Sequence, residues 1–374
     1  MLSHINDAVS VSVDDPVNSH ILAIAEDRLE GFHERPFERI AALCGLSLDE
    51  VLGRVRVMLE AGVIRRIRQT IHAARLSCGA LIAWRLAECE LDSAFNWLMN
   101  HDPFTGHIVL RRAEYDLPGA EYQLWTTLRV PFGYDLQRHC QLLKLNIKAD
   151  HYVLLPARAM FALGVGHIRR RGLKPGAKNP ESPRPADLSA LSLNELEWQV
   201  LEILKRELDI SELINDFWRL RAARAGMDYG TFLRVVRDLD RRGLLGRFST
   251  FLEHVRGDVA RSPVTRYNAL FQWSVPEGRE LEAGAQISRF LIMTHVYWRA
   301  GAGSFAAANL WGMAHGLNRD LLLRHKTAID LHLENVGLPA MFTNVFWSLR
   351  SVVRPSEILS SRYQEWAARH GLND

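Results

Sequence analysis

The stretch that decides the fold is MLEAGVIRR at residues 58–66, because it recurs as DLDRRGLLGR at 238–247. Further segments recur in the same order: ALIAWRLAE (80–88) as ALFQWSVPE (269–277), and a strand with His then Arg (107–112) as residues 295–299. The offset is nearly constant, since His107 and His295 differ by 188 positions. A duplication of this length indicates two copies of one small module, so the differences between the copies bear on function.

Composition describes a globular chain with enough apolar material for several cores, since 48% of its 374 residues are hydrophobic and 24% are charged. The apolar stretches are too short to cross a bilayer, and the start MLSHINDAVSVSVDD has no basic and apolar leader. We therefore expect a cytoplasmic protein without a membrane partner. The four cysteines all lie in the first copy without close pairing, which argues against a disulfide framework or a cysteine metal site.

Each copy opens with a pattern typical of a winged helix-turn-helix. In the first copy, residues 17–29 have helical apolar spacing, Pro36 can open a second helix, and Ser47 with Glu50 forms a capping box for a third. The following GVIRRIRQTIHAARL (62–76) alternates basic and apolar residues, as a β-ribbon does. The second copy repeats this plan with helices at 193–206, 210–223 and 228–242 and a wing at 244–255.

The remainder of each copy predicts a β-α-β-β-α-β order. In the first copy, strands are expected at 78–86 and 151–155 and helices at 91–100 and 134–145. In the second copy, strands are expected at 267–275 and 340–349 and helices at 279–290 and 319–332. Two further strands around a turn lie between the two helices of each copy. That order is the ferredoxin-like unit, an antiparallel sheet with helices on one face. The fold class is therefore α+β, with two tandem copies of a winged helix-turn-helix followed by a ferredoxin-like domain.

The expected domains follow one another along the chain. They are winged helix-turn-helix (1–76) and ferredoxin-like domain (77–164) of copy 1, a linker rich in charge, Gly and Pro (165–187), winged helix-turn-helix (188–256) and ferredoxin-like domain (257–350) of copy 2, and a C-terminal helix (351–374). Such an exposed linker is long enough to let the two modules pair as a built-in dimer.

Several motifs resemble those of the siroheme decarboxylases of heme d1 and alternative heme biosynthesis, which share the Lrp/AsnC architecture. HERPFERIAALCGLSLDEVLGRVRVMLEAGVIRR (33–66) is similar to the N-terminal unit of that family, and NALFQWSVPE (268–277) to its first sheet strand. THVYWR (294–299) resembles the family's His-Cys-Tyr-x-Arg strand, and NLWGMAHG (309–316) its Asn-Leu-Tyr-x-Met-x-His-Gly strand.

The resemblance implies removal of two acetate carboxyl groups from a siroheme-type tetrapyrrole, with methyl groups left behind. It implies no cofactor beyond this iron-containing substrate and no metal site in the protein. Implied partners are further decarboxylase subunits or a second copy of the chain, whereas neither DNA nor a membrane is expected.

The second copy has the residue types that this reaction needs: cations for the substrate carboxylates, a flat apolar wall, and an acid for the carbon that loses CO₂. His295, Tyr297 and Arg299 alternate along one predicted strand and point to one face, while His315 closes the neighbouring strand. We assign His315 and His295 as catalytic acids, because histidine titrates near neutral pH. Arg299 and Tyr297 are assigned to substrate binding, and Trp311 either walls the macrocycle or fills the core.

The first copy departs from the family pattern. It keeps His107 and Arg111, but Val109 stands where the family has tyrosine and Arg129 where the second histidine is expected. One copy then catalyses while the other grips carboxylates, and the substrate-binding residues assigned to it are His107, Arg111, Arg112 and Arg129.

Two other functions remain open. Arginines near both third helices and wings are compatible with an Lrp/AsnC-type DNA-binding regulator, although the third helix of the first copy opens with two carboxylates, Asp49 and Glu50. A non-catalytic heme or tetrapyrrole-binding protein is the third possibility, with His295 or His315 as an iron ligand.

Overall fold

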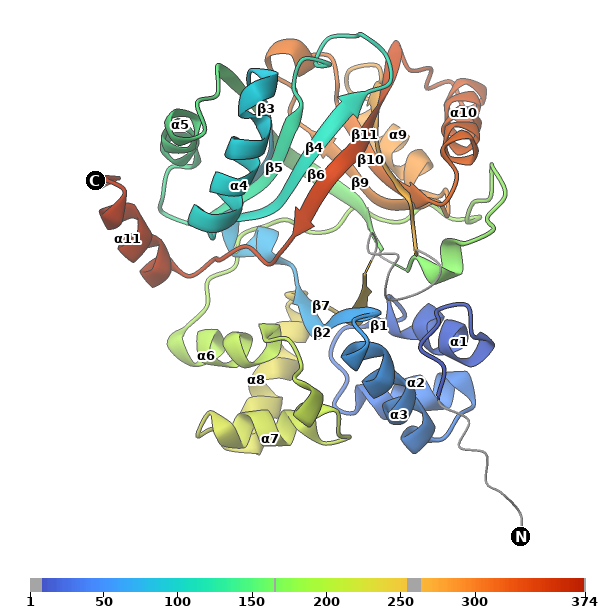
Figure 1. The fold of residues 1–374 in the computed structure, drawn as a ribbon, viewed down its shortest axis with the longest axis vertical. Coiled ribbons are helices and arrows are strands. Elements are labelled where there is room, and N and C mark those ends of the chain that lie inside the picture. The colour runs from blue at the N-terminus through green and yellow to red at the C-terminus, as the bar shows by residue number, and fades with distance from the viewer. Residues whose placement is uncertain (1–8, 165, 254–263, 373–374) are drawn as a thin grey trace. The chain divides into compact units, whose positions relative to one another are not determined.

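The computed structural model describes residues 9–164, 166–253 and 264–372, and it divides the chain into two compact units. The winged-helix unit comprises Met1–His72, Gly164–Gly172 and Ser192–Arg266, and the barrel unit comprises Ala73–Leu163, Leu173–Leu191 and Tyr267–Asp374. Each unit therefore takes residues from both copies (Figure 1). No helix of the described ranges is long and apolar enough to span a membrane.

The winged-helix unit combines three helices of each copy with one shared sheet (Figure 1). Its helices are α1 (Pro16–Ala25), α2 (Pro36–Cys44), α3 (Leu48–Glu60), α6 (Glu195–Lys205), α7 (Phe217–Arg224) and α8 (Tyr229–Arg241). Its strands are β1 (Leu29–Glu30), β2 (Ile64–Ile71) and β7 (Leu245–Leu252), in the order β1-β7-β2. The wings of the two copies thus pair with each other, because a strand edge that stays unpaired leaves backbone groups without hydrogen bonds.

Local hydrogen bonds explain where these helices begin and end. Ser47 caps α3 through the Glu50 amide, and Asp228 caps α8 through the Thr231 amide. The helix predicted at 210–223 is wrong, because the chain forms a short 3₁₀ turn, η4 (Ile210–Glu212), before α7. Asp209 caps η4, and the Glu212 carboxylate accepts a hydrogen bond from the Arg221 guanidinium at 2.6 Å, which holds the turn against α7.

The barrel unit contains β-α-β-β-α-β twice. Its first half has β3 (Ser77–Arg85), α4 (Leu91–His101), β4 (Thr105–Ala113), β5 (Leu124–Pro131), α5 (Leu136–Asn146) and β6 (His151–Leu163). Its second half has β8 (Tyr267–Ser274), α9 (Glu280–Ser288), β9 (Met293–Arg299), β10 (Leu310–Gly316), α10 (Arg319–Asn335) and β11 (Phe342–Val353). A C-terminal helix, α11 (Ser360–Arg369), follows, and short 3₁₀ turns lie at Ala73–Arg75, Glu88–Glu90, Ile168–Arg170 and Gly303–Phe305.

The eight strands close into one antiparallel barrel, in the order β10-β8-β11-β4-β5-β3-β6-β9. The sequence predicted two tandem ferredoxin-like units that can pair, whereas the structure is a mixed α/β fold in which the strands of both copies form a single barrel. Closure comes from two pairings between the halves, β6 with β9 and β11 with β4, which leave no sheet edge exposed. Figure 1 shows α4 and α5 outside the first half and α9 and α10 outside the second.

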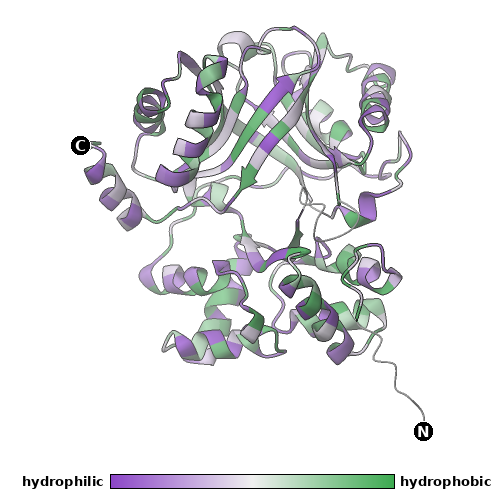
Figure 2. Cartoon of the chain, in the orientation of Figure 1, coloured by the Kyte–Doolittle hydropathy of each residue, from purple (hydrophilic) through white to green (hydrophobic). Residues whose placement is uncertain are grey.

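Three apolar clusters stabilise the barrel unit. Two of them pack the outer strand faces against helices, one in each half. The third joins inward-facing residues of both halves, among them Trp125, Phe305, Trp311 and Phe346. Figure 2 shows hydrophobic and hydrophilic residues interspersed along the strands and the covering helices.

Within the segment predicted as an exposed linker, residues 166–168 and 170 are buried, whereas most residues from 172 to 187 are exposed. Residues 164 and 166–172 belong to the winged-helix unit, where the Asp27 carboxylate accepts a hydrogen bond from the Gly166 amide. Leu173–Leu191 belongs to the barrel unit, where the Asn179 amide donates to the Arg289 carbonyl and the Ala186 amide to the Met160 carbonyl. Val165 of the predicted linker, and His254 and Val255 of the predicted second wing, lie outside the described residues.

Candidate functional site

Polar side chains of both halves share the barrel interior with the third apolar cluster. Along β9, His295, Tyr297 and Arg299 face inward, because Val296 and partly buried Trp298 between them pack in the outer core. Along β10, Trp311 and Met313 belong to the inner cluster, and His315 continues the same alternation. The pattern on β4 and β5 places His107, Arg111, Trp125 and Arg129 inward as well.

The interior has an aromatic end and a polar end. Trp125, Trp311, Phe305 and Phe346 form the aromatic end, with ring centroids 5.2 to 6.5 Å apart. The polar end contains half-buried His295, His315, Arg129 and Asn268 together with the exposed His107. Side chains at the polar end are thus within reach of solvent, whereas Trp125 and Trp311 are fully buried.

The barrel strands contain no acidic residue. None of the eight strands has an aspartate or a glutamate, although the whole chain has 43 of these residues. The inward-facing arginines therefore have no carboxylate on any strand to neutralise them. An interior of this composition attracts an anionic ligand.

Two inward arginines are almost fully buried, Arg111 at 6% and Arg299 at 8% exposure. Arg299 donates from Nη1 to the Leu155 carbonyl at 2.8 Å, and Arg111 donates to the Phe346 carbonyl at 3.5 Å and to Ser348 Oγ at 3.0 Å. The Nε atom of each has no hydrogen-bond partner among the described residues. Burying an uncompensated guanidinium costs free energy, which a bound carboxylate would recover.

The pKa values of these arginines express the same electrostatics. Burial lowers the pKa of Arg111 to about 9, and burial, opposed by Tyr297 and reinforced by nearby Arg129, lowers the pKa of Arg299 to about 10. Burial also lowers the pKa of Arg129, again opposed by Tyr297. Arg129 of the first half therefore acts on Tyr297 and Arg299 of the second half.

β9 carries an ordered stack of side chains. The Arg299 guanidinium lies 4.4 Å from the centre of the Tyr297 ring, and the His295 ring stacks beside Tyr297 at 6.2 Å with an interplanar angle of 15°. Met313 on β10 pairs in register with His295 on β9, and His315 pairs with Asn268 on β8. The two histidines thus lie on adjacent strands at the same end of the barrel.

Two predicted binding residues lie apart from this polar end. Arg112 is exposed and lies on the outer face of β4, since adjacent residues of a strand point in opposite directions. Trp311 lies in the aromatic end, and its Nε1 has no hydrogen-bond partner among the residues that the structure describes.

Sequence reasoning missed three polar residues in or beside the interior. Asn268 and Gln272 alternate with Leu270 of the inner cluster, and Thr294 precedes His295. Gln272 is fully buried, and neither polar atom of its side chain has a partner among the described residues. The two-residue alternation along the predicted strand 267–275 was the signal that could have found Asn268 and Gln272.

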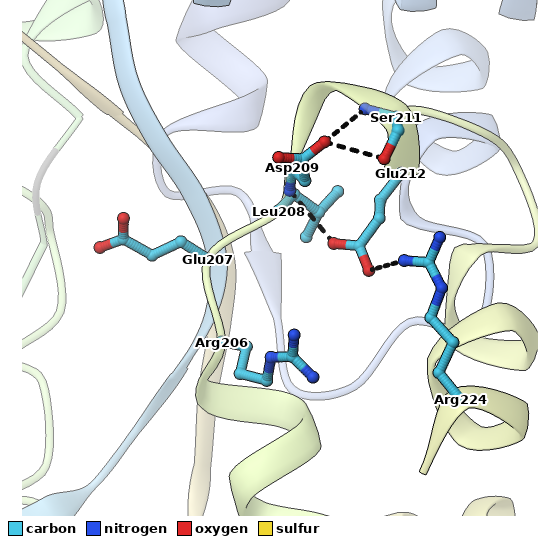
Figure 3. Close-up of a pocket in the computed structure, with 7 residues that line it drawn as sticks. All are labelled: Arg206, Glu207, Leu208, Asp209, Ser211, Glu212 and Arg224. Carbon is cyan, nitrogen blue, oxygen red and sulfur yellow. Dashed lines mark hydrogen bonds and ion pairs between the residues drawn. The ribbon is translucent and has the colours of Figure 1, made fainter.

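A hollow elsewhere, drawn in Figure 3, belongs to the winged-helix unit and contains none of the predicted site residues. It is lined by Arg206, Glu207, Leu208, Asp209, Ser211, Glu212 and Arg224. The dashed contacts in Figure 3 are those of the η4 turn, where Glu212 is neutralised by Arg224 at 3.2 Å and also by Arg221. We therefore interpret these contacts as structural.

Comparison with known proteins agrees with this architecture. The family model "Siroheme decarboxylase NirDL-like HTH domain" matches residues 32–65, and the model "AsnC-like ligand binding domain" matches 265–341. The chain is thus a mixed α/β protein with helix-turn-helix and AsnC-like domains.

The relatives indicate the particular family. A siroheme decarboxylase beta subunit of Oleidesulfovibrio alaskensis is 26% identical over 115 residues, which are 29% of this chain and 69% of the relative. The crystal structure of the siroheme decarboxylase NirDL matches 94% of this chain and 97% of its own, at 22% identity and a TM-score of 0.65. Its complex with an iron-uroporphyrin III analogue matches 94% and 99%, at 21% identity and a TM-score of 0.63. The helix-turn-helix model and the beta subunit carry the name of the siroheme decarboxylase family, which the motifs predicted, and the two solved structures share the fold of this chain.

Proposed function

We propose that this chain is a siroheme decarboxylase, or a subunit of one, that removes acetate carboxyl groups from a siroheme-type tetrapyrrole. The observation that carries the proposal is the barrel interior, where arginines and histidines of both halves converge on strands that contain no carboxylate. A polyacidic ring supplies the negative charge that this interior lacks. The names of the matched relatives, and the iron-uroporphyrin analogue in one title, support the same substrate class.

The proposed chemistry needs one proton for each carboxyl group. The bond between the acetate CH₂ and its carboxylate carbon breaks, CO₂ leaves, and the electron pair stays on the CH₂ carbon. A protonated imidazole then donates its proton to that carbon, so the acetate becomes a methyl group. We assign this donation to His315 and His295, which lie half-buried at the polar end.

The remaining interior residues would hold the substrate. Arg299, Arg129 and Arg111 supply charge for its carboxylates, Tyr297 orients Arg299, and the exposed His107 lies at the mouth of the polar end. Arg112 has no place in this site because of its outward position. Trp311 would close the substrate site at the aromatic end, and the histidines and Tyr297 would line its sides.

We also propose the finer fold and assembly. Each barrel half corresponds to one ferredoxin-like unit. Along the chain, the two copies follow each other in the six segments predicted from the sequence. Because a matched relative is named a beta subunit, we propose that further subunits or a second copy complete the active enzyme, in the cytoplasm.

A DNA-binding regulator is the second candidate, favoured by exposed Arg234, Arg237 and Arg241 on α8. Contacts within the winged-helix unit weigh against it. Tyr229, in the first turn of α8, donates its hydroxyl to Glu34 at 3.1 Å, and Arg237 pairs with the same carboxylate. The helix end that reads bases in such proteins is thus engaged with the first copy.

Anaerobic incubation of the purified chain with siroheme distinguishes these functions. Loss of CO₂ from the tetrapyrrole, seen by mass spectrometry, supports the decarboxylase. A shift of the Soret band without a change in mass would instead indicate a tetrapyrrole carrier. No shift, together with salt-sensitive binding to an operator, would indicate the regulator.

A further inference from the structure

Thr294 occupies an unusual position beside His295. On β10, Met313 pairs with His295 and the next residue, Ala314, pairs with Met293, so Thr294 is the extra residue of a β-bulge in β9. Its side chain is fully buried. Bulges of this kind re-aim a neighbouring side chain, and here that neighbour is a proposed catalytic histidine.

The hydrogen bonds of Thr294 bear on which nitrogen of His295 carries a hydrogen. The Thr294 hydroxyl lies 3.1 Å from the Met313 carbonyl, which can only accept, and the same oxygen lies 3.0 Å from His295 Nδ1. With its one hydrogen donated to Met313, this oxygen is left to accept from His295. That arrangement favours a hydrogen on Nδ1 of the neutral ring, which leaves Nε2 to carry the second proton.

We propose that Thr294 is a positioning residue that holds His295 in the Nδ1–H tautomer, so that Nε2 delivers the proton to the carbon that loses CO₂. This inference rests on the proposed function and names the acting atom of one of its acids. In the step, the Nε2–H bond breaks as the new C–H bond forms, the substrate's electron pair enters that bond, and the imidazole is left neutral. Solvent then reprotonates Nε2.

Neighbouring groups hold the plane of the same ring. Tyr297 stacks beside His295, and the Arg299 guanidinium lies over Tyr297. Among the described charged or titratable groups, Tyr297 and Arg299 lie on the same strand as His295, and His315 lies on neighbouring β10. Arg129 from β5 interacts electrostatically with Tyr297 and Arg299.

The first half contains a natural contrast to this arrangement. The residue before His107 is Gly106, which has no hydroxyl to offer. A Cβ at Gly106 would collide with Ser356 Oγ and lie 3.1 Å from the Arg354 carbonyl, so this position leaves no room for a threonine. The register of β4 with β5 also skips Gly106, so both halves have the bulge, and only the hydroxyl belongs to the second half.

Nitrogen NMR tests the inference without relying on turnover. In protein labelled with ¹⁵N-histidine, a long-range ¹H–¹⁵N correlation spectrum reports the tautomer of each ring, and His295→Gln identifies the His295 signals by their disappearance. We expect the Nδ1–H form for His295 in the wild type and in Thr294→Ser, which keeps the hydroxyl. Thr294→Val should shift His295 toward the Nε2–H form. An Nε2–H tautomer in the wild type, or an unchanged one in Thr294→Val, would overturn the proposal.

Kinetics supply the functional half of the test. Loss of tautomer control should lower kcat of Thr294→Val by roughly 10- to 100-fold with little change in KM, and Thr294→Ser should restore it. Equal loss in the valine and serine variants would mean that Thr294 has only a structural role. A wild type with the Nδ1–H tautomer but no turnover of siroheme would contradict the proposed function while supporting the assignment of Thr294.

Discussion

The two halves of the barrel have the same strands but different interiors. His107 and Arg111 of β4 correspond to His295 and Arg299 of β9, each 188 positions apart. Their buried arginines behave alike, since Arg111 donates to the Phe346 carbonyl of the second half and Arg299 to the Leu155 carbonyl of the first. Each half thus anchors one arginine on the backbone of the other.

The difference lies around those shared residues. Val109 replaces the tyrosine that stacks with His295, and Arg129 stands where the second half has His315. The first half has therefore gained a cation and lacks a second imidazole. Arg129 interacts electrostatically with Tyr297 and Arg299 across the barrel, so under the proposed function binding charge and proton donation are divided between the copies.

The largest expected effect tests proton donation. His315→Ala should lower kcat by roughly 10²- to 10⁴-fold, the contribution of a positioned general acid, with little change in siroheme affinity. His107→Ala removes an imidazole from the first half, where it corresponds to His295, and serves as the control, because its effect should fall on binding. Single-turnover rates and equilibrium titrations measure both. Equal losses of kcat in the two variants would erase the functional difference between the halves.

The next effect tests what the halves share. Trp125→Ala and Trp311→Ala should each reduce the free energy of unfolding by about 3–5 kcal/mol, because both rings are fully buried in one aromatic cluster. Urea unfolding of the barrel, followed by fluorescence and circular dichroism, measures this loss. If Trp311→Ala were to weaken siroheme binding and leave stability intact, Trp311 would be a wall of the substrate site after all.

A smaller effect tests the binding charge of the first half. Arg129→Ala should weaken siroheme binding by about 1.5–3 kcal/mol, the cost of losing a charged hydrogen bond. Arg112→Ala, on the outer face of the same half, should change affinity by less than about 0.5 kcal/mol. Equal affinities of the two variants would remove Arg129 from the proposed site.

The smallest effect concerns the packing of α11 on the first half, where Trp366 stacks on His139 and His139 lies beside the buried Asp102. Burial alone would raise the pKa of Asp102, but nearby His139, the Thr105 hydroxyl and the Phe104 amide outweigh it and lower that pKa below 3.8. A carboxyl with a lowered folded-state pKa stabilises the fold above its unfolded value and stops doing so as the pH falls through the folded value.

Acid unfolding checks this contribution. Below about pH 4 the free energy of unfolding of wild type should fall more steeply than that of Asp102→Asn, by at most about 1.4 kcal/mol per pH unit for one proton. If the free energies of unfolding of the two proteins fell equally with pH below about pH 4, Asp102 would contribute nothing to the pH dependence of stability.

Local sequence signals predicted much of this molecule. The duplication, the capping of α3 by Ser47 and the alternation of His295, Tyr297 and Arg299 depend on residues close together in the chain. The absence of acidic residues from the predicted strands was equally readable. These signals are local, so they survive without knowledge of tertiary contacts.

Barrel closure could not be predicted in this way. It depends on pairings such as Leu163 with His295 and His107 with Val353, and periodicity specifies faces but never partners. The pairing of β2 with β7 could not be predicted either, because periodicity does not specify which strands pair. Arg111 and Arg112 were both assigned to binding, although alternation allows only one of two adjacent residues to face inward.

The most direct test of the central claim is the mass of siroheme after anaerobic reaction with the chain in heavy water. The account predicts that each CO₂ lost is replaced by one deuterium on the new methyl group, and that the His295→Ala, His315→Ala double variant binds siroheme but leaves its mass unchanged. Siroheme that returns intact from the wild type, or loses CO₂ as fast with the double variant, would contradict it.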